Sequence, residues 1–329
     1  MSGGALERWK VSRNSGRNAK FPYYAGCVAA GLVPGAVWRW LGQRIRDGRW
    51  GGGDPVAAAE RAAYACKLAP GAEVGAEPGC HRTGREGWPR RKHTYFFDAR
   101  SATRWFPRDL AYRLVLGDVT WIPERPSFVK SRPVAGDNAN SVLLPLNRVR
   151  HFVFVDDPLA WEEKDDVAVF RGKIHLKPKR MRLFEAWFGK PGFDFGDTSG
   201  ERPRPEWVLP PLSIWEQLRH RFVMSVEGND VASNLKWIFH SNSLAVMPRP
   251  EFETWFEEGR LLPGVHYIEV RPDFADLEEK IRHYAARPAL CAEINRAEKA
   301  WAARFRDPAT ERLAAVHTAW RYFRATGQM

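Results

Sequence analysis

The first candidate functional site in this sequence is a basic segment that follows a short apolar run. Residues 167–170 are apolar and bounded by charge, as in a buried parallel strand, and residues 171–182 hold six Lys or Arg and no acidic residue. Ligands of open α/β sheets bind beyond the carboxyl ends of the strands, where such cations suit a diphosphate. We therefore predict a phosphate site here, with a solvated basic loop as the alternative. The residues concerned are Arg171, Gly172, Lys173 and Arg180.

A second candidate anion site is the sequence Glu227-Gly228-Asn229-Asp230. It separates a strand-like run, residues 222–226, from a helical stripe over residues 231–240. Glycine permits a tight turn, and the first turn of a helix offers free N–H groups and the positive end of its dipole. We predict an anion site at this turn. Helix capping by Asn229 or Asp230 is the alternative, and it is the commoner use of such residues.

Two carboxylate positions are candidates for catalysis or metal binding. Asp118 ends an apolar stretch and can act as a general base, although most such residues form turns. Asp156 and Asp157 follow a strand-like run and can hold a divalent metal beneath a diphosphate, or form a turn. The sequence contains no GxSxG, HExxH or Walker phosphate loop.

The composition favours a folded protein with an anionic partner. The chain has 329 residues, enough for two domains, and 51 basic against 39 acidic residues give a net charge of +12. Such a charge suits nucleic acid, anionic lipid headgroups or phosphorylated substrates. The four cysteines form no CxxC pair, so we expect reduced thiols and neither a zinc ribbon nor a thioredoxin-like motif.

The location in the cell is predicted from the N-terminal region and the charge. Residues 25–37 are apolar but too short to cross a bilayer, and Trp38 follows them instead of a small-residue cleavage site. We expect a mature N-terminal segment and a cytoplasmic protein, bound peripherally to the inner face of the cytoplasmic membrane. Residues 90–92, all basic and on a predicted exposed loop, would contribute to that binding.

The predicted elements alternate between strand and helix, which indicates an α/β fold with right-handed crossovers. An acidic segment with one lysine, residues 162–166, divides the chain into predicted domains 1–163 and 164–329. Predicted strands cover residues 94–98, 143–146, 151–155, 167–170, 222–226, 244–247 and 267–270. Predicted helices cover residues 36–46, 55–68, 180–188, 231–240, 274–286, 289–304 and 310–325. Residues 108–117 are predicted to be helical or mixed, and residues 190–212 are predicted to be loop.

An ordered set of short motifs gives the sequence a family resemblance. The set comprises Gly117-Asp118 with Pro123, then VKSRP at 129–133, NSVLLPL at 140–146, RHF at 150–152, FRG at 170–172 with Arg180, EGND at 227–230, NLKW at 234–237, SNS at 241–243 and VHYI at 265–268. Together they resemble glycosyltransferase family 90, best in its bacterial lipopolysaccharide-modifying type. Fungal capsule-associated proteins and animal protein O-glucosyltransferases are relatives in that family.

The resemblance implies a fold, a reaction and a set of site residues. The fold would be two Rossmann-like domains facing a cleft, in a GT-B-like arrangement. The reaction would move a hexose or pentose from a nucleotide-diphosphate sugar, a UDP-sugar, to a glycan such as the lipopolysaccharide core, with no metal or other cofactor and no nucleic-acid partner. Asp118 matches the stretch with the catalytic aspartate. Arg171 and Arg180 match basic donor-binding positions, and residues 227–236, with Asn234 and Lys236, match the second donor segment.

The expected mechanism is direct displacement at the anomeric carbon. Asp118 would take the proton of the acceptor hydroxyl, while basic side chains and the predicted helix N-terminus stabilise the leaving diphosphate. Two alternatives remain at this point. One is a metal-dependent glycosyltransferase that uses Asp156 and Asp157, and the other is a basic nucleic-acid-binding protein.

Overall fold

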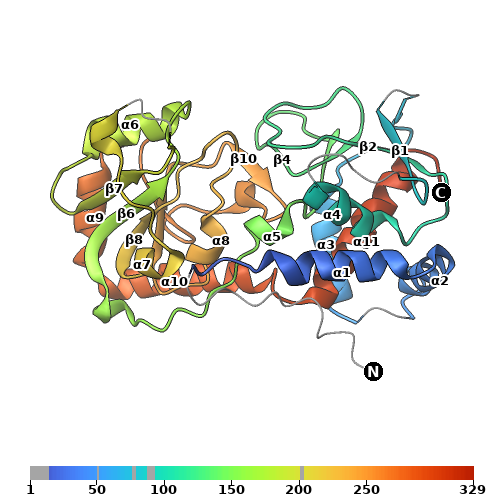
Figure 1. Ribbon diagram of the computed structural model, residues 1–329, viewed down its shortest axis with the longest axis horizontal. Helices are drawn as coiled ribbons and strands as arrows, with labels where there is room; N and C mark the ends of the chain where they lie inside the picture. The colour runs from blue at the N-terminus through green and yellow to red at the C-terminus, as the bar shows by residue number, and fades with distance from the viewer. Residues whose placement is uncertain (1–14, 50–51, 76–78, 87–92, 201–203) are drawn as a thin grey trace.

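The computed structural model describes residues 15–49, 52–75, 79–86, 93–200 and 204–329. It contains two larger sheets, one toward each end of an elongated molecule (Figure 1). The first sheet joins β1 (Cys80–Arg82), β2 (Ala111–Leu114), β3 (Ser127–Val129) and β5 (Ser141–Leu143). The second joins β6 (Asp165–Gly172), β7 (Phe193–Asp197), β8 (His220–Met224), β9 (Leu244–Met247) and β11 (Ile268–Glu269).

The second sheet is entirely parallel, in the order β11-β9-β8-β6-β7. Counted along the chain, its strands run 2-1-3-4-5, an order that occurs in doubly wound α/β sheets. The strand order reverses between β6 and β8. Loops that leave the carboxyl ends of these two strands diverge there and leave room for a ligand.

Alternating side chains bury both faces of the second sheet. Phe170 and Phe222 point into a core that includes α6 (Pro178–Trp187), α9 (Leu277–Ala285) and part of α10 (Pro288–Ala303). Val169 and Val223, one residue along, point into the larger core with α8 (Leu235–Ile238). Burial on both faces explains why the strands are continuous apolar runs in the sequence.

The first sheet is mixed, because β1 is antiparallel to β2 while β2, β3 and β5 are parallel. The last helix, α11 (Pro308–Ala325), packs beside α3 (Pro55–Ala65) and α4 (His93–Thr103) at this end of the molecule (Figure 1). The Tyr322 hydroxyl on α11 donates to the carbonyl of Pro126 at 2.9 Å. The final helix therefore lies with the first sheet, although it follows the predicted division at 163–164 in sequence.

A third, two-stranded sheet connects the two regions. β4 (Ser131–Pro133) pairs antiparallel with β10 (Phe252–Thr254). Within this pair Nε of Arg132 lies 2.7 Å from Oε1 of Glu253, and both side chains are buried. The guanidinium also donates to the backbone carbonyls of Tyr64, Ala65 and Ser141. The pairing holds residues 117–133 beside residues 227–254, which are remote in sequence.

The remaining elements are short or peripheral. They are α1 (Lys20–Leu32), α2 (Gly35–Arg46), α5 (Arg148–His151), α7 (Ile214–Gln217) and the 3-10 turns Trp161–Glu163, Pro205–Trp207 and Glu258–Arg260. Among the residues that the structure describes, no helix has both the length and the apolar character needed to cross a membrane. The predicted basic loop at 90–92 lies outside the described residues.

The structure confirms the α/β class and most elements predicted for the second half of the chain. It also confirms the helix at 36–46 and, over Pro55–Ala65, the helix predicted for 55–68. The strand predicted for 143–146 lies earlier, at Ser141–Leu143. The finer prediction of two Rossmann-like domains, and the division at 163–164, remain predictions.

Four predicted elements are wrong. Residues 94–98 form helix α4 instead of a strand, since Tyr95, Ala99 and Ala102 bury one helical face against the core and packing overrides the aromatic β-propensity. Residues 151–155 end helix α5 and then run without regular structure. Residues 108–117 contain strand β2. Residues 190–212 contain strand β7, where a side chain at Gly196 would clash with Leu209 at 2.6 Å.

The predicted helix over residues 231–240 is also shorter than expected. Only Leu235–Ile238, four residues, is helical. Asn234 donates from Nδ2 to the carbonyl of Met224 at 2.9 Å and accepts from the Ser225 hydroxyl at 3.1 Å. These bonds fasten the chain to the end of β8, so the preceding residues form turns instead of a first helical turn.

Candidate active site

Asp118 lies beside the turn formed by residues 227–230, although 111 residues separate it from Asn229. Its Oδ1 accepts from Nζ of Lys130 at 2.6 Å, and its Oδ2 accepts from Nδ2 of Asn229 at 2.8 Å. The carboxylate remains 31% exposed. Two predicted site residues, Asp118 and Asn229, therefore come together, and one carboxylate edge stays open to a ligand.

Lys130 holds two carboxylates together at the base of this arrangement. Its Nζ lies 2.6 Å from Oδ1 of Asp118 and 2.7 Å from Oδ2 of Asp230, and both Lys130 and Asp230 are buried. Burial alone lowers the pKa of Lys130, but Asp230, Tyr95 and Asp118 outweigh it and raise the pKa above its ordinary value. The lysine therefore stays charged at neutral pH.

The same contacts set the charge of Asp118. Burial raises the pKa of Asp118, but Lys130, Asn229 and Arg150 together outweigh it and lower the pKa below its ordinary value. The neighbouring residue is fixed as well, because the Ser131 hydroxyl bonds to both N and O of Val119 at 3.0 and 3.1 Å. Asp118 is therefore ionised at neutral pH and can accept a proton.

Arg180 joins the loop after β6 to the segment after β8. Its Nε donates to the carbonyl of Val226 at 3.0 Å, and its Nη1 donates to the carbonyl of Lys173 at 2.8 Å. Burial and the nearby Arg150 lower the pKa of Arg180 to about 10, against the effect of Asp230, so it keeps its charge at neutral pH. A side chain on Gly228 would come within 3.0 Å of this guanidinium, so glycine allows the close approach.

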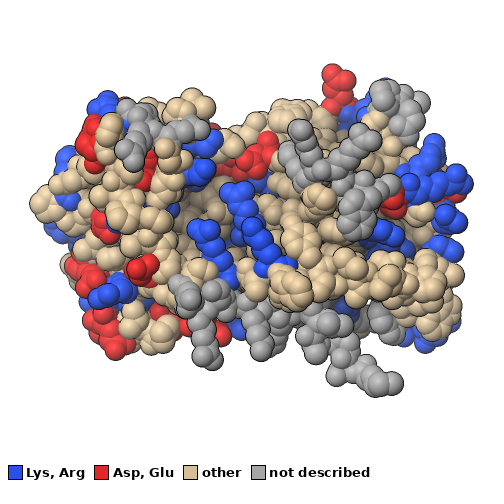
Figure 2. Space-filling view, in the orientation of Figure 1, with Lys and Arg blue, Asp and Glu red and all other residues tan. Residues whose placement is uncertain are grey.

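Two lysines complete the positive group around the 227–230 turn. Lys177 donates to Oδ1 of Asn229. Lys179 ion-pairs with Glu227 and, at 2.8 Å, with Glu251. Glu227 also accepts from the backbone N–H groups of Glu251 and Phe252, each at 3.0 Å. Figure 2 shows Lys and Arg side chains gathered at the middle of the visible face, between the regions of the two large sheets.

Arg171 points away from this group. It alternates with Phe170 along β6, and its guanidinium donates to Oδ1 of Asp194 at 2.7 Å and to the carbonyls of Asp194 and Pro210 at 2.8 and 3.1 Å. Gly172 follows, where a side chain would come within 3.0 Å of the Phe170 ring. The Lys173 side chain is exposed. The donor-binding role of Arg171 stays a prediction.

Lys236 is enclosed beneath the site. It is fully buried, bonds to Glu258 and lies 5.2 Å from the centre of the Phe256 ring. Glu258 also accepts from the backbone N–H of Thr254 at 2.7 Å. Asn234 likewise bonds within the fold, as described above. Asn234 and Lys236, both predicted to bind the donor, are therefore bonded to neighbouring protein groups in this structure.

The predicted anion site at a helix N-terminus is wrong in its geometry. Helix α8 begins at Leu235, not at Val231, and the N–H of Gly228 donates to the carbonyl of Asp230 at 3.0 Å. No free first turn of a helix therefore faces an anion at residues 227–231. Positive charge at the turn comes from side chains instead.

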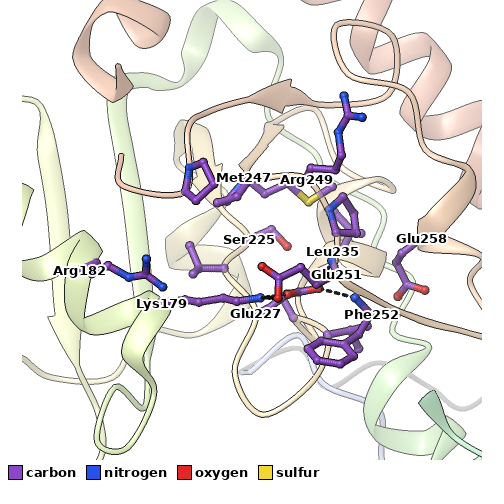
Figure 3. A pocket seen from close by; sticks show the side chains of 16 residues that line it. Lys179, Arg182, Ser225, Glu227, Leu235, Met247, Arg249, Glu251, Phe252 and Glu258 are labelled. Atoms are coloured by element: carbon purple, nitrogen blue, oxygen red, sulfur yellow. Dashed lines mark hydrogen bonds and ion pairs between the residues drawn. The ribbon is translucent and has the colours of Figure 1, made fainter. Parts of the chain in front are cut away.

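A pocket opens at the carboxyl ends of β8 and β9 (Figure 3). Its walls include Ser225 and Val226 after β8, Met247 at the end of β9 with residues 248–252 that follow it, and Lys179 and Arg182 from α6. In Figure 3 Lys179 reaches from α6 toward Glu227 and Glu251. Ser225, Arg182, Arg249 and Glu251 were not predicted from the sequence. The strand prediction at 244–247, with the rule that ligands bind at strand ends, was a signal that pointed to Arg249 and Glu251.

Comparisons with known proteins show the family of this chain. A family model described as Glycosyl transferase family 90 matches residues 148–305. The O-glucosyltransferase LpsA of Dichelobacter nodosus is 41% identical over 237 residues, which cover 72% of this chain and 74% of that protein. The chain belongs to glycosyltransferase family 90. Protein O-glucosyltransferase 1 of Rattus norvegicus is 26% identical over 145 residues, covering 41% of this chain and 36% of the rat protein.

Family 90 membership makes the protein an enzyme, a glycosyltransferase with a sugar donor and a glycan acceptor. The net charge alone was compatible with an enzyme or with a nucleic-acid-binding protein. Membership of family 90 identifies the protein as an enzyme. The candidate site combines the ionised carboxylate of Asp118, a group of cations around the 227–230 turn and a pocket at strand ends. Such a site can accept a proton at one end and stabilise a leaving anion at the other.

Asp156 and Asp157 have separate surroundings in this family 90 enzyme. The side chain of Asp157 is buried, and it accepts from Nζ of Lys164 at 2.7 Å and from the backbone N–H of Asn242 at 2.9 Å. Asp156 is exposed and lies 3.8 Å from Arg306. Within the described part of the chain, no group of three or more His, Cys, Asp or Glu residues has an arrangement suited to a metal ion. The contacts of Asp157 fit the turn that was the alternative prediction.

Proposed function

We propose that this family 90 enzyme transfers a hexose or pentose from a UDP-sugar to a glycan acceptor such as the lipopolysaccharide core. One observation carries the proposal. The carboxylate of Asp118 is hydrogen-bonded to the same turn whose Glu227 lines the pocket at the strand ends. A nucleotide in that pocket would extend its diphosphate toward the turn. The sugar would then lie near Asp118.

In the proposed reaction the acceptor hydroxyl attacks the anomeric carbon, and the bond from that carbon to the diphosphate oxygen breaks. Asp118 takes the hydroxyl proton. Negative charge that develops on the diphosphate is stabilised by Lys177, Lys179 and Arg180, already assembled around the turn. The transition state is oxocarbenium-like, as in glycoside chemistry in general. We propose that these cations suffice and that the enzyme needs no metal or other cofactor.

The proposed fold assignment is GT-B-like, with residues 1–163 on the acceptor side and residues 164–329 on the donor side. The order of strands in the second sheet supports a donor domain of the doubly wound type. The acceptor class is supported by the name of the Dichelobacter nodosus relative, an O-glucosyltransferase, and by the net charge of +12. A basic enzyme suits an acceptor that carries phosphate groups.

A panel of nucleotide sugars, read by thermal unfolding, tests the donor. A UDP-sugar at 100 times its dissociation constant should add about 2.7 kcal/mol to the free energy of unfolding, while GDP- and CMP-sugars should add little. Transfer should survive complete chelation of divalent metal. Stabilisation by a different nucleotide would overturn the UDP assignment. Loss of transfer on chelation, with recovery on adding metal, would support the metal-dependent alternative.

A further inference from the structure

Helix α1 (Lys20–Leu32) exposes an apolar stripe that the catalytic proposal does not use. Phe21, Ala25, Val28 and Leu32 are spaced as one face of a helix, and all four are exposed. The exposed fractions are 83% for Phe21, 50% for Val28 and 80% for Leu32. Lys20 is the only charged residue in this helix. Exposed apolar surface of this kind marks an interaction site.

Helix α2 (Gly35–Arg46) extends the same surface. Val37 and Trp40 are 41% and 59% exposed, and the Arg44 guanidinium lies 5.0 Å from the centre of the Trp40 ring. Residues 15–46 contain five Lys or Arg and no Asp or Glu. Over α1 and α2, the face seen in Figure 2 consists mostly of uncharged side chains, with Lys and Arg nearby. Asp47, the exposed residue that caps α2, interacts with Arg46 and offsets part of this charge. The surface thus combines exposed apolar side chains with a net positive charge.

The opposite sides of the two helices are firmly attached to the protein. Tyr23 on α1 is buried and donates to Oδ1 of Asp98 at 3.0 Å. Gly42 on α2 packs so closely on the backbone of Trp105 that a side chain there would clash with its carbonyl at 2.1 Å. The helices have one packed side and one apolar side that faces solvent.

We propose that the exposed face of α1 and α2 docks on an anionic lipid surface and holds the enzyme beside a lipid-linked acceptor. At 13 residues, α1 is too short to span a bilayer, but it can lie in the interface with its apolar stripe buried. Trp40 beside Arg44 suits the headgroup region, where aromatic and basic side chains gather. This proposal deepens the proposed function, since it rests on an acceptor that is attached to a membrane.

Charge complementarity favours a lipid surface over a second copy of the chain. Two copies placed face to face would bring two segments of net positive charge together, which costs electrostatic free energy. An anionic bilayer instead attracts each basic residue, by about fivefold in partitioning per residue near the surface. Burial of the apolar stripe of α1 in the bilayer interface adds a hydrophobic contribution to binding.

Vesicle sedimentation tests the proposal with the full chain. The parent enzyme should bind vesicles of phosphatidylcholine with phosphatidylglycerol, bind phosphatidylcholine alone much more weakly, and dissociate in high salt. The double variant Phe21→Ser/Leu32→Ser should lower partitioning at least about tenfold, because two large apolar side chains no longer enter the interface. Leu262→Ser is the matched control, because Leu262 is 55% exposed and lies outside α1 and α2.

Two results would overturn the proposal. One is binding of the double variant to anionic vesicles as strong as that of the parent. The other is a parent that sediments as a dimer while the double variant sediments as a monomer, which would make the face an interface between copies. Nucleotide-sugar binding, read by thermal unfolding, should be equal in parent and double variant. Failure of donor binding in both would reject the proposed function and leave the result on vesicles standing.

Discussion

At the scale of single residues, Asp118 carries the proposed proton transfer. Asp118→Asn retains the shape of the side chain and an oxygen that can accept from Lys130, but it removes the base. We expect turnover to fall about 100-fold to 10,000-fold while donor affinity, measured by calorimetry, stays within a factor of two or three. Asp156→Asn is the control, because Asp156 is exposed and its ion-pair partner is Arg306, which is not part of the turn.

Two outcomes would move the catalytic role elsewhere. Near-normal turnover in Asp118→Asn, with loss in a folded Asp156 or Asp157 variant, would transfer it to that pair. Folding must be checked for Asp157→Asn, because Asp157 forms a buried ion pair with Lys164. Lost donor binding in Asp118→Asn would place Asp118 on the donor side.

Lys130 should set the pH range in which Asp118 is ionised. Lys130, Asn229 and Arg150 act on Asp118 and together outweigh its burial, so its pKa is low. Lys130→Gln removes the nearest cation, so the pKa of Asp118 should rise. The acidic limb of the pH profile of kcat/KM should then move to higher pH, because protonated Asp118 is inactive.

Because Lys130 is buried, its replacement should also lower the stability of the protein, and a variant that retains the charge serves as the control. Removing one partner of a buried ion pair costs about 3–5 kcal/mol, so Lys130→Gln should also be less stable. Lys130→Arg retains the charge, so the acidic limb of its kcat/KM profile should lie close to that of the parent. An unchanged pH profile in a folded Lys130→Gln variant would mean that Asp118 is not the titrating base.

At the scale of elements, Arg180 ties the loop after β6 to the segment after β8. Arg180→Met removes its charge and leaves the carbonyls of Val226 and Lys173 without this donor. Donor affinity should fall about 10-fold to 100-fold, as expected for a lost hydrogen bond to a charged group. Isothermal calorimetry with UDP measures this directly.

Arg171→Met is the matched comparison, since Arg171 is the other arginine predicted from the basic loop. Its guanidinium is bound to Asp194 and Pro210, so this variant should lose stability with little change in donor affinity. An equal loss of affinity in both variants would support the sequence prediction. The guanidinium of Arg171 would then have to leave Asp194 when the donor binds.

At the scale of the whole molecule, a half-buried histidine, His240, makes the free energy of unfolding depend on pH. His240 packs its ring 4.5 Å from the centre of the Phe154 ring, and burial, with help from Arg306, lowers its pKa to about 4. The folded state therefore resists protonation that the unfolded state accepts. This contribution opposes folding as the pH falls below the ordinary histidine pKa of about 6.5 toward 4.

His240→Phe retains a ring against Phe154 but removes the titration. Between pH 7 and pH 5 the parent should lose more free energy of unfolding than the variant, measured by urea denaturation. Only the difference between the two proteins is predicted, because buried Glu298, whose pKa is raised, acts in the opposite direction. Equal losses in both proteins would contradict the prediction.

The sequence alone determined those features that local pattern encodes. The apolar runs at 167–170 and 244–247 specify buried parallel strands, because both faces of such a strand meet helices and no polar position interrupts the run. The long helices at 289–304 and 310–325 have enough periodic apolar residues to be recognised without their partners. The basic residues after β6 and the EGND turn were therefore located correctly in the chain.

Only the tertiary structure decided which of those residues meet. Asp118 contacts Asn229 because β4 pairs with β10, and no local pattern contains the register of that pairing. Arg171 faces Asp194 while Arg180 faces Val226, because the alternation of β6 sends one side chain away from the turn and α6 returns the other to it. Residues 94–98 became helix and residues 231–234 became turns for the same reason. Burial against distant segments, and bonds such as that from Asn234 to Met224, outweighed the local propensity that the sequence displays.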